Sequence, residues 1–363
     1  MKKESRTAQP GPRPTMTDIA TEAGVSQSTV SLVLNHMSGA KVAPETRERV
    51  LAVAAQLGYQ LLRRKTMAPP AAPAADGAVR NVVVYLADEI ATSPHPAQTM
   101  DGARTAAWEQ NCLLSVFVTG GDVALEEACV RSALANPAVL GVVYASTFTR
   151  QIKLPAALSR WHGTGGRCVL LNCSGGGRDI SSVVPGEVAG GFAATERLVG
   201  AGHRRIAFIN GEPWMDAAQD RLKGYRQALA TADIAFDAEL VRDGDWMSGS
   251  GFDHALALLR QPRPPSAIFC ANDLMALGVL EAAKKLGLSV PEQLSVMGYD
   301  DQEIARHAHP PLSTVLLPNY AMGHWAVERL LQEASAPQPG VARFIKMECP
   351  VVDRASVAPY RPA

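Results

Sequence analysis

The strongest constraint on the fold is the alternation of apolar, β-rich runs with segments of helical periodicity between residues 81 and 300. The apolar runs lie at 81–87, 113–118, 140–145, 168–172, 205–210, 266–271 and 294–300. Helical spacing of apolar residues marks 98–111, 124–135, 188–199, 222–231, 251–259 and 273–286. Short apolar runs that alternate with amphipathic helices are typical of buried parallel strands. We therefore predict an α/β body with doubly wound parallel sheets, long enough for two similar lobes with a ligand cleft between them.

A segment rich in proline and alanine separates this body from the N-terminal part of the chain. Residues 66–78, TMAPPAAPAADGA, contain three prolines and six alanines, which interrupt any helical period. Such a composition predicts a semi-extended linker, which we place at 66–79. The chain then has an N-terminal part at 14–65 and a body at 80–359.

Charge is distributed unevenly between these parts. Residues 1–68 carry ten basic and five acidic side chains, which leaves 25 basic and 30 acidic side chains in the rest. A basic end on an acidic body is expected where that end meets a polyanion.

Hydrophobic residues make up 47% of the chain, which excludes a disordered or fibrous protein. No run of 18 apolar residues occurs, so we expect a cytoplasmic protein without membrane contact.

The residues that could carry enzymatic or metal chemistry do not form a recognisable motif. Six cysteines lie far apart, mostly inside apolar runs, and we interpret them as reduced core residues. The glycine-rich segments 175–177 and 200–202 do not stand between a strand and a helix in the order that a dinucleotide site requires. His203 is interpreted as a helix-end residue that binds carbonyl groups. We expect no enzymatic activity, no cofactor and no metal.

The N-terminal part has the spacing of a helix-turn-helix. Thr15 is a candidate N-cap of a first helix, Gly24 ends that helix in a left-handed turn, and Ser26 caps a second helix over 27–34. A third helix is predicted over 44–58. The expected core residues are Ile19, Ala20, Ala23, Val30, Val33, Leu34, Val50, Val53, Ala54 and Leu57. Spacing alone also permits a plain three-helix bundle that binds no DNA, but the positive charge and the polar start of the second helix favour DNA binding.

Two stretches of this part, TMTDIATEAGVSQSTVSLVLN (15–35) and VAPETRERVLAVAAQLGY (42–59), resemble the headpiece of the LacI-type transcription regulators. The resemblance implies that the second helix enters a major groove, with Gln27 and Ser28 at base-contacting positions. The positions that match contacts to the DNA backbone are Thr15, Thr29, Ser31, Asn35 and Thr46, and Arg63 and Arg64 are candidates for further phosphate contacts.

Two departures from the family pattern stand in this region. Leu32 replaces an arginine that is frequent in the family, so a guanidinium fork for guanine is missing. The family's minor-groove leucine is also missing, because Ala68 stands at its position and is followed by Pro69 and Pro70. Leu62 or Met67 is a substitute wedge if a hinge helix forms on DNA.

The resemblance continues through the body, most sharply at 181–229, 268–301, 310–318 and 349–359. It implies an effector-binding domain of the periplasmic-binding-protein type over 80–359, with two lobes joined by three crossovers. We place the N-lobe at about 80–184 and 318–338, and the C-lobe at about 185–317 and 339–359. Arg221, Trp246, Asn272 and Asp300 match the family's effector-contacting positions. Their donors, acceptors and aromatic ring suit a polyhydroxyl ligand, although any one of these residues taken alone is more often structural.

Taken together, these features predict a sequence-specific DNA-binding regulator, expected to be a repressor, that responds to a carbohydrate or similar small polar effector. We expect a homodimer on a near-palindromic operator in double-stranded DNA. We do not expect a tetramer, because the sequence shows no C-terminal heptad segment that would favour one. Whether the effector releases or tightens the DNA stays open. The alternative is a sugar-binding module whose head no longer recognises operators.

The loop 88–98, with two prolines and His95, is longer than usual in the family and is a candidate for setting effector selectivity.

Overall fold

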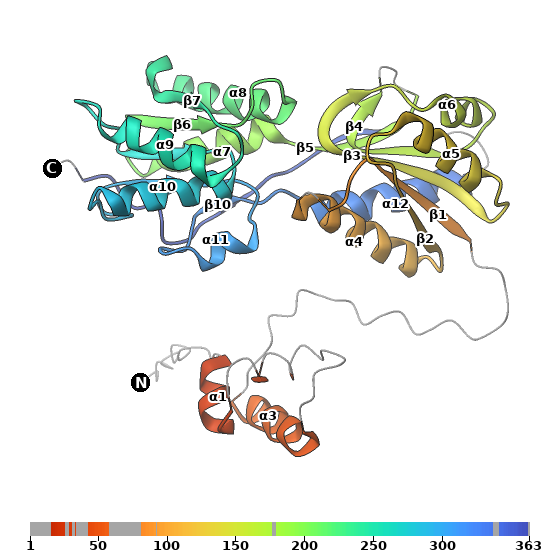
Figure 1. Cartoon of the computed structure of the whole chain (residues 1–363), viewed down its shortest axis with the longest axis horizontal. Helices are drawn as coiled ribbons and strands as arrows, with labels where there is room; N and C mark the ends of the chain where they lie inside the picture. The colour runs from red at the N-terminus through yellow and green to blue at the C-terminus, as the bar shows by residue number, and fades with distance from the viewer. Residues whose placement is uncertain are drawn as a thin grey trace, which may run out of the picture. The chain divides into compact units, whose positions relative to one another are not determined.

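The structure is a computed structural model that describes residues 16–25, 29–30, 33, 43–57, 81–91, 93–175, 179–336 and 341–361. The chain divides into two compact units, Met1–Ala72 and Pro73–Ala363, and each is described by itself (Figure 1). The predicted linker lies entirely outside the described residues. Within the described residues, no helix is long and apolar enough to cross a lipid bilayer.

The first unit contains helices α1 (Met16–Ala23) and α3 (Pro44–Gln56), and Thr29, Val30 and Val33 between them are also helical. Gly24 follows α1 with a φ of 63°, the left-handed conformation predicted for it. The core of this unit is formed by Ile19, Ala20, Ala23, Val30, Val33, Val50, Val53 and Ala54, with Val25 and Leu57 packed against it. The predicted core is therefore confirmed, except that Leu34 lies outside the described residues.

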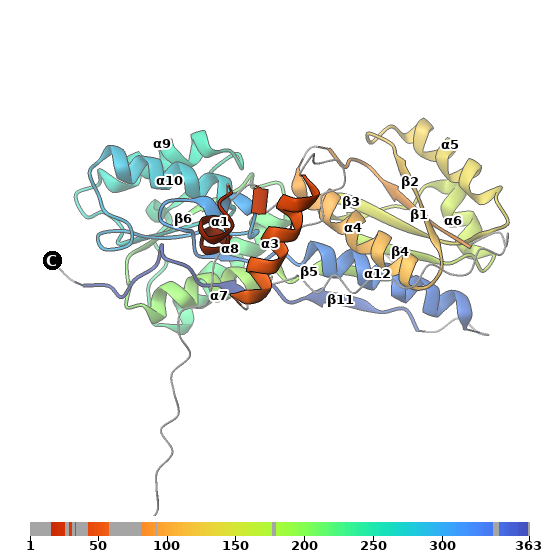
Figure 2. The ribbon, with the colours of Figure 1, turned by 90° about the horizontal axis from the view of Figure 1, so that it is seen from below.

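The first half of the second unit, here called the N-lobe, contains a six-stranded sheet of order β11-β5-β4-β3-β1-β2 with parallel neighbours. Its strands are β1 (Val82–Ala87), β2 (Leu113–Val118), β3 (Val139–Ile152), β4 (Cys168–Gly175), β5 (Ser181–Pro185) and β11 (Phe344–Met347). Helices α4 (Pro94–Glu109) and α12 (Asn319–Ser335) cover one face, and α5 (Val123–Leu134) and α6 (Ala156–Gly163) cover the other (Figures 1 and 2). Alternate residues of β1 enter the two apolar clusters, as expected for a strand that is buried on both faces.

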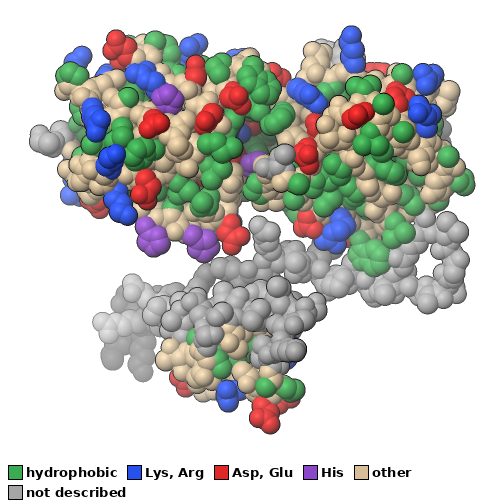
Figure 3. Space-filling view, in the orientation of Figure 1, with side chains coloured by type: hydrophobic (Ala, Val, Ile, Leu, Met, Phe, Trp, Pro, Cys, Tyr) green, Lys and Arg blue, Asp and Glu red, His purple; other side chains and the backbone are tan. Residues whose placement is uncertain are grey.

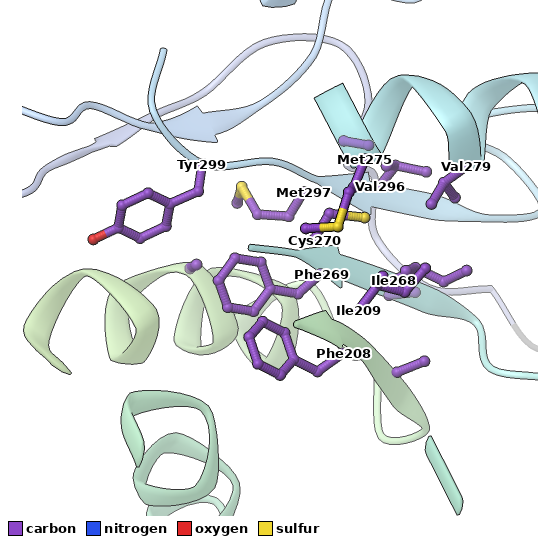
Figure 4. Close-up of a cluster of buried hydrophobic side chains, with 14 of the residues drawn as sticks. Phe208, Ile209, Ile268, Phe269, Cys270, Met275, Val279, Val296, Met297 and Tyr299 are labelled. Atoms are coloured by element: carbon purple, nitrogen blue, oxygen red, sulfur yellow. The ribbon is translucent and has the colours of Figure 1, made fainter. Parts of the chain in front are cut away.

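The other half, the C-lobe, contains a four-stranded parallel sheet of order β7-β6-β8-β9. Its strands are β6 (Ile206–Asn210), β7 (Val241–Asp243), β8 (Ala267–Cys270) and β9 (Ser295–Met297). Its helices are α7 (Glu187–Gly200), α8 (Asp216–Thr231), α9 (Ser248–Leu259), α10 (Asp273–Lys285), α11 (Glu303–His307) and the 3-10 turn η1 (Ala238–Leu240). In its core, Phe208 and Phe269 stack with ring centroids 4.7 Å apart (Figure 4). The doubly wound, two-lobed α/β architecture is thereby confirmed.

The chain crosses between the lobes after β5, after β10 (Thr314–Val315) and between β11 and β12 (Val351–Val352). The assignment of the whole of 339–359 to the C-lobe is wrong for β11. This strand pairs in parallel with β5 and extends the N-lobe sheet, which satisfies backbone groups that would otherwise face an open sheet edge. The chain returns to the C-lobe only at β12, which pairs with β10.

The six cysteines behave as predicted. All are free, and five of them are buried in the apolar interior. Burial raises the pKa of the Cys349 thiol to about 12, so this side chain stays protonated at neutral pH.

Candidate functional site

Polar side chains gather where the parallel strands of the C-lobe end. Asn210 closes β6, Asn272 lies two residues after β8, and Asp300 lies three residues after β9. Arg221, on α8, reaches the same place, with Nη1 3.5 Å from Asp300 Oδ1. Ligands of open parallel sheets bind beyond the carboxyl ends of the strands. This edge faces the N-lobe, because Asp300 lies 3.3 Å from His95. The surface has a recess between the two lobes (Figure 3).

The four predicted effector residues form one connected group. The Arg221 guanidinium joins Asp300 to the indole of Trp246, whose ring centre lies 5.6 Å from the guanidinium carbon. The Asn272 amide donates to the Trp246 carbonyl oxygen at 2.8 Å. Residues from four separate segments of the sequence therefore meet at a single site.

Arg221 is more heavily engaged than the sequence indicates. Its Nε and Nη2 donate to the two carboxylate oxygens of Glu187 at 2.8 and 2.9 Å, and Nη1 donates to the Ala271 carbonyl. The guanidinium also lies 3.7 Å from the ring centre of Tyr299. These partners use most of its five donors, so Arg221 supports the site more than it offers free hydrogen bonds to a ligand.

Glu187 is a further residue of this site, and no motif in the sequence points to it. It begins α7 directly after the crossover from β5, and its side chain is 3% exposed. An acidic residue in the first turn of a helix is ordinary, because it complements the helix dipole. Its position after a buried strand was the available signal, but its pairing with Arg221 could not be seen in the sequence.

Asp300 is a buried carboxylate held in an uncommon backbone conformation. Its φ is 106°, in a region that side chains other than glycine rarely adopt. Burial acts to raise the pKa of Asp300, but His95, Arg221 and Gln302 together lower it below its ordinary value. The carboxylate is therefore ionised at neutral pH and is a strong acceptor.

Asn272 and Trp246 combine structural roles with ligand-binding capacity. Asn272 Oδ1 accepts from the Met275 amide at 2.8 Å, so Asn272 caps α10. The Trp246 ring lies against Gly211, where a Cβ atom would stand 1.9 Å from the ring. The φ of Trp246 is 68°. Packing against Gly211 thus holds Trp246 in a strained backbone conformation. Strain that the surrounding structure maintains is found at functional sites.

Three buried polar atoms of this site lack a hydrogen-bond partner within the described part of the chain, and one of them is the Tyr299 hydroxyl. Asn210 Oδ1 is a buried acceptor and Trp246 Nε1 is a buried donor. An unsatisfied buried polar group costs about 1–3 kcal/mol. Hydroxyl groups, which both donate and accept, are suited to these atoms.

A second group of polar side chains lies at the carboxyl end of β1 in the N-lobe. Asp88, directly after β1, accepts from the Thr147 amide and hydroxyl at 2.8 and 2.6 Å and from Arg150 at 3.1 Å. The expected loop 88–98 is partly helical, because α4 begins at Pro94. Its two prolines stand in the first turn, where an amide hydrogen has no partner within the helix, so both are tolerated there.

The predicted DNA contacts are only partly within the described residues. Thr29 and Thr46 are helical and half-buried. The remaining predicted contacts lie outside the described residues: Thr15, Gln27, Ser28, Ser31, Asn35, Arg63 and Arg64.

Comparison with known protein families identifies both units. Residues 15–60 match the family described as bacterial regulatory proteins, lacI family, and residues 195–357 match a periplasmic binding protein-like domain.

Curated relatives match over nearly the full length. The ribose operon repressor of Haemophilus influenzae is 33% identical over 94% of this chain and 98% of its own. The HTH-type transcriptional regulator CelR of Thermobifida fusca is 33% identical over 90% of this chain and 94% of its own.

Solved structures agree with these relatives. A CelR–cellobiose complex superposes with a TM-score of 0.61 at 30% identity, covering 95% of this chain and 100% of that one. The lac repressor dimer bound to operator and the anti-inducer ONPF superposes with a TM-score of 0.64 at 28% identity, covering 96% and 100%.

Proposed function

The chain belongs to the LacI family of bacterial regulatory proteins, and we propose that it is a transcriptional repressor whose affinity for DNA is set by a sugar bound between its lobes. The headpiece spans 14–65, the linker 66–79 and the effector-binding domain 80–359. The protein works in the cytoplasm, where its DNA is, and needs no cofactor. Its relatives are transcription regulators and not enzymes, which supports a regulatory role without catalysis.

The observation that carries the effector assignment is the polar environment of Asp300. This ionised carboxylate lies at the same edge of the C-lobe sheet as Asn210, and Arg221 links it to Trp246. Asn210 Oδ1 and Trp246 Nε1 are buried and have no hydrogen-bond partner among the described residues. Vicinal hydroxyls of a sugar supply donors for Asp300 and Asn210 and an acceptor for Trp246. Asn272 positions Trp246, and Arg221 holds Asp300. The cellobiose in the complex of the relative CelR supports the same ligand class.

DNA recognition is assigned to the helix-turn-helix. Gln27 and Ser28 read base edges, and Thr15, Thr29, Ser31, Asn35 and Thr46 fix the register on phosphates, with Arg63 and Arg64 adding charge. Two headpieces in a homodimer contact half-sites about one helical turn apart, which is about 10 base pairs. The operator is therefore near-palindromic.

Control of DNA binding follows from linkage between the two sites. A ligand that binds one arrangement of the lobes more tightly shifts the protein toward that arrangement. The coupling free energy between an effector site and a DNA site is typically about 1–3 kcal/mol. Release of DNA by the sugar identifies an inducer, and tighter binding identifies a corepressor.

Thermal unfolding against a panel of sugars tests the effector site. The panel contains cellobiose, D-ribose, other mono- and disaccharides, sugar phosphates and nucleosides. A ligand at a hundred times its Kd stabilises the folded state by about 2.7 kcal/mol, which is a shift of several degrees. We expect a response to one group of related sugars that is lost in Asp300→Asn. If no sugar raises the melting temperature, the assignment of the effector class is wrong.

A further inference from the structure

We propose that His95 closes the cleft of the effector-free protein by holding Asp300 across the lobes, and that an effector has to replace it there. This inference rests on the proposed effector site. It adds a residue that determines which ligands enter that site, since an effector must compete with an imidazole of the protein.

The imidazole of His95 is held between the two lobes. His95 lies in the first turn of α4, and its Nε2 is 3.3 Å from Asp300 Oδ2. Its Nδ1 lies 2.9 Å from Asn319 Nδ2. Donation by the Asn319 amide leaves Nδ1 as the acceptor, which places the ring proton on Nε2, facing the carboxylate.

The two ends of this chain of contacts belong to different lobes. Asn319 begins α12 and also donates to Gln98 Oε1 on α4 at 3.3 Å, so His95 is fixed by N-lobe helices. Asp300 belongs to the C-lobe, and Gln302 donates to its Oδ2 at 3.1 Å. The contact between His95 and Asp300 therefore spans the cleft.

The same aspartate fastens one of the crossovers. The Asp300 amide donates to the Val315 carbonyl at 2.7 Å, and the Leu317 amide donates to the Asp300 carbonyl at 3.3 Å. This crossover leads directly into Asn319. Backbone and side-chain contacts of Asp300 thus form a closed ring through His95 and Asn319, which resists separation of the lobes beside the crossover.

Exposure shows why His95 and an effector exclude each other. The Asp300 side chain is 4% exposed, whereas that of His95 is 23% exposed. Asp300 Oδ1 faces Arg221, and Oδ2 is shared by Gln302 and His95. His95 is more exposed than Arg221, whose side chain is 4% exposed, so a hydroxyl reaches Oδ2 by taking the place of His95.

A second contact between the lobes provides an independent reporter. Phe148 in the second half of β3 meets Trp214 from the loop after β6, with ring centroids 6.0 Å apart in an edge-to-face arrangement. Both rings are exposed, at 44% and 64%. Because this contact involves none of the residues around His95, its loss indicates separation of the lobes and not a local change near His95.

Hydrogen exchange on the effector-free, full-length protein tests the proposal. His95→Leu removes the donor, and His95→Gln keeps an amide donor of similar reach. His324→Leu is the matched control, because His324 also contacts a carboxylate, Glu109, at 2.9 Å with 26% exposure, but within the N-lobe alone.

We expect His95→Leu to speed exchange severalfold in peptides that cover 146–149 and 211–215, His95→Gln to recover most of the protection, and His324→Leu to leave these peptides unchanged. A folded His95→Leu protein with wild-type exchange in both segments overturns the proposal.

Titration with cellobiose and with D-ribose separates this proposal from the proposed function. Loss of the competing imidazole should make His95→Leu bind the responding sugar more tightly than the wild type does. Weaker binding by His95→Leu would make His95 an effector contact and overturn the competition. If neither sugar binds the wild type, the choice of effector is at fault, and the exchange experiment still decides whether His95 closes the cleft.

Discussion

Arg221 and Glu187 meet inside the C-lobe through two parallel hydrogen bonds of 2.8 and 2.9 Å, with side chains only 4% and 3% exposed. The pair joins α8 to α7 directly beneath the cleft. One guanidinium thereby balances two carboxylates, Glu187 first and Asp300 second, since its distance to Asp300 is 3.5 Å. Asp300 consequently keeps acceptor capacity that an effector, or His95, can use.

Breaking the buried pair should destabilise the protein strongly. Glu187→Gln leaves the Arg221 charge without its principal partner, and the loss of one member of a buried pair costs about 3–5 kcal/mol. The measurement is urea-induced unfolding. Arg104→Ala is the control, because its pair with Asp101 is 63% and 51% exposed and should contribute less than about 1 kcal/mol. Equal effects of the two substitutions would contradict this account.

The contact between α7 and α8 predicts a contrast between two glycines. A Cβ atom on Gly224 would stand 2.2 Å from the Val188 carbonyl oxygen, whereas one on Gly200 would meet nothing within 4 Å. We expect Gly224→Ala to destabilise by about 1–3 kcal/mol and Gly200→Ala to be neutral or stabilising by up to about 1 kcal/mol. Thermal unfolding of the two variants measures the difference, and a stable Gly224→Ala protein would show that the helices do not pack this closely.

His203 predicts how stability changes with pH. Burial lowers the pKa of this imidazole, which contacts Ser266, Ser295 and the Ala358 carbonyl. Below about pH 6.5 the unfolded chain binds a proton that the folded state resists, so the contribution of His203 is complete above that pH and is lost as the pH falls. His203→Gln should flatten the decline of unfolding free energy between pH 7 and 5.

A histidine on the surface provides the comparison for this pH experiment. The His307 side chain is 74% exposed, so His307→Gln should leave the pH profile as it is in the wild type. A profile of His203→Gln that matches the wild type would mean that His203 does not resist protonation.

Gln27 and Thr46 are expected to affect DNA binding in different ways. Gln27→Ala should reduce discrimination at one base pair by about 1–3 kcal/mol, because it removes a base-edge contact. Thr46→Ala should weaken binding to all sequences alike, because a phosphate contact carries no sequence information. Competition binding with single-base variants of the operator distinguishes the two, and a uniform loss of affinity in Gln27→Ala would remove it from the base-reading set.

The sequence predicted the fold where the hydrophobic pattern was continuous. The strands ending at Ala87, Asn210 and Cys270 have uninterrupted apolar runs, and the structure places them where predicted. The edge strands β7 and β11 escaped prediction because they are short and only partly buried, so they lack that signal. The lobe of β11 could not be predicted for another reason, because strand order is set by pairing and not by position in the chain.

The candidate site shows a similar division. Arg221, Trp246, Asn272 and Asp300 could be chosen from motifs, and the structure brings them together. Glu187, Gln302 and Asn319 could not be chosen, because each acts through a partner far away in the sequence or through backbone geometry. Trp246 and Asp300 also adopt positive φ values, which could not be predicted because neither residue is a glycine.

The most direct test of the central claim is selection of binding sites by the full-length protein from a pool of random duplex DNA at about 0.15 M salt, where nonspecific attraction is weakened. The account predicts enrichment of one near-palindromic sequence with half-sites about 10 base pairs apart, and an affinity for it that changes when the responding sugar is added. Recovery of unrelated sequences, bound equally and released by salt alone, would contradict it and would identify a sugar-binding protein whose head no longer reads DNA.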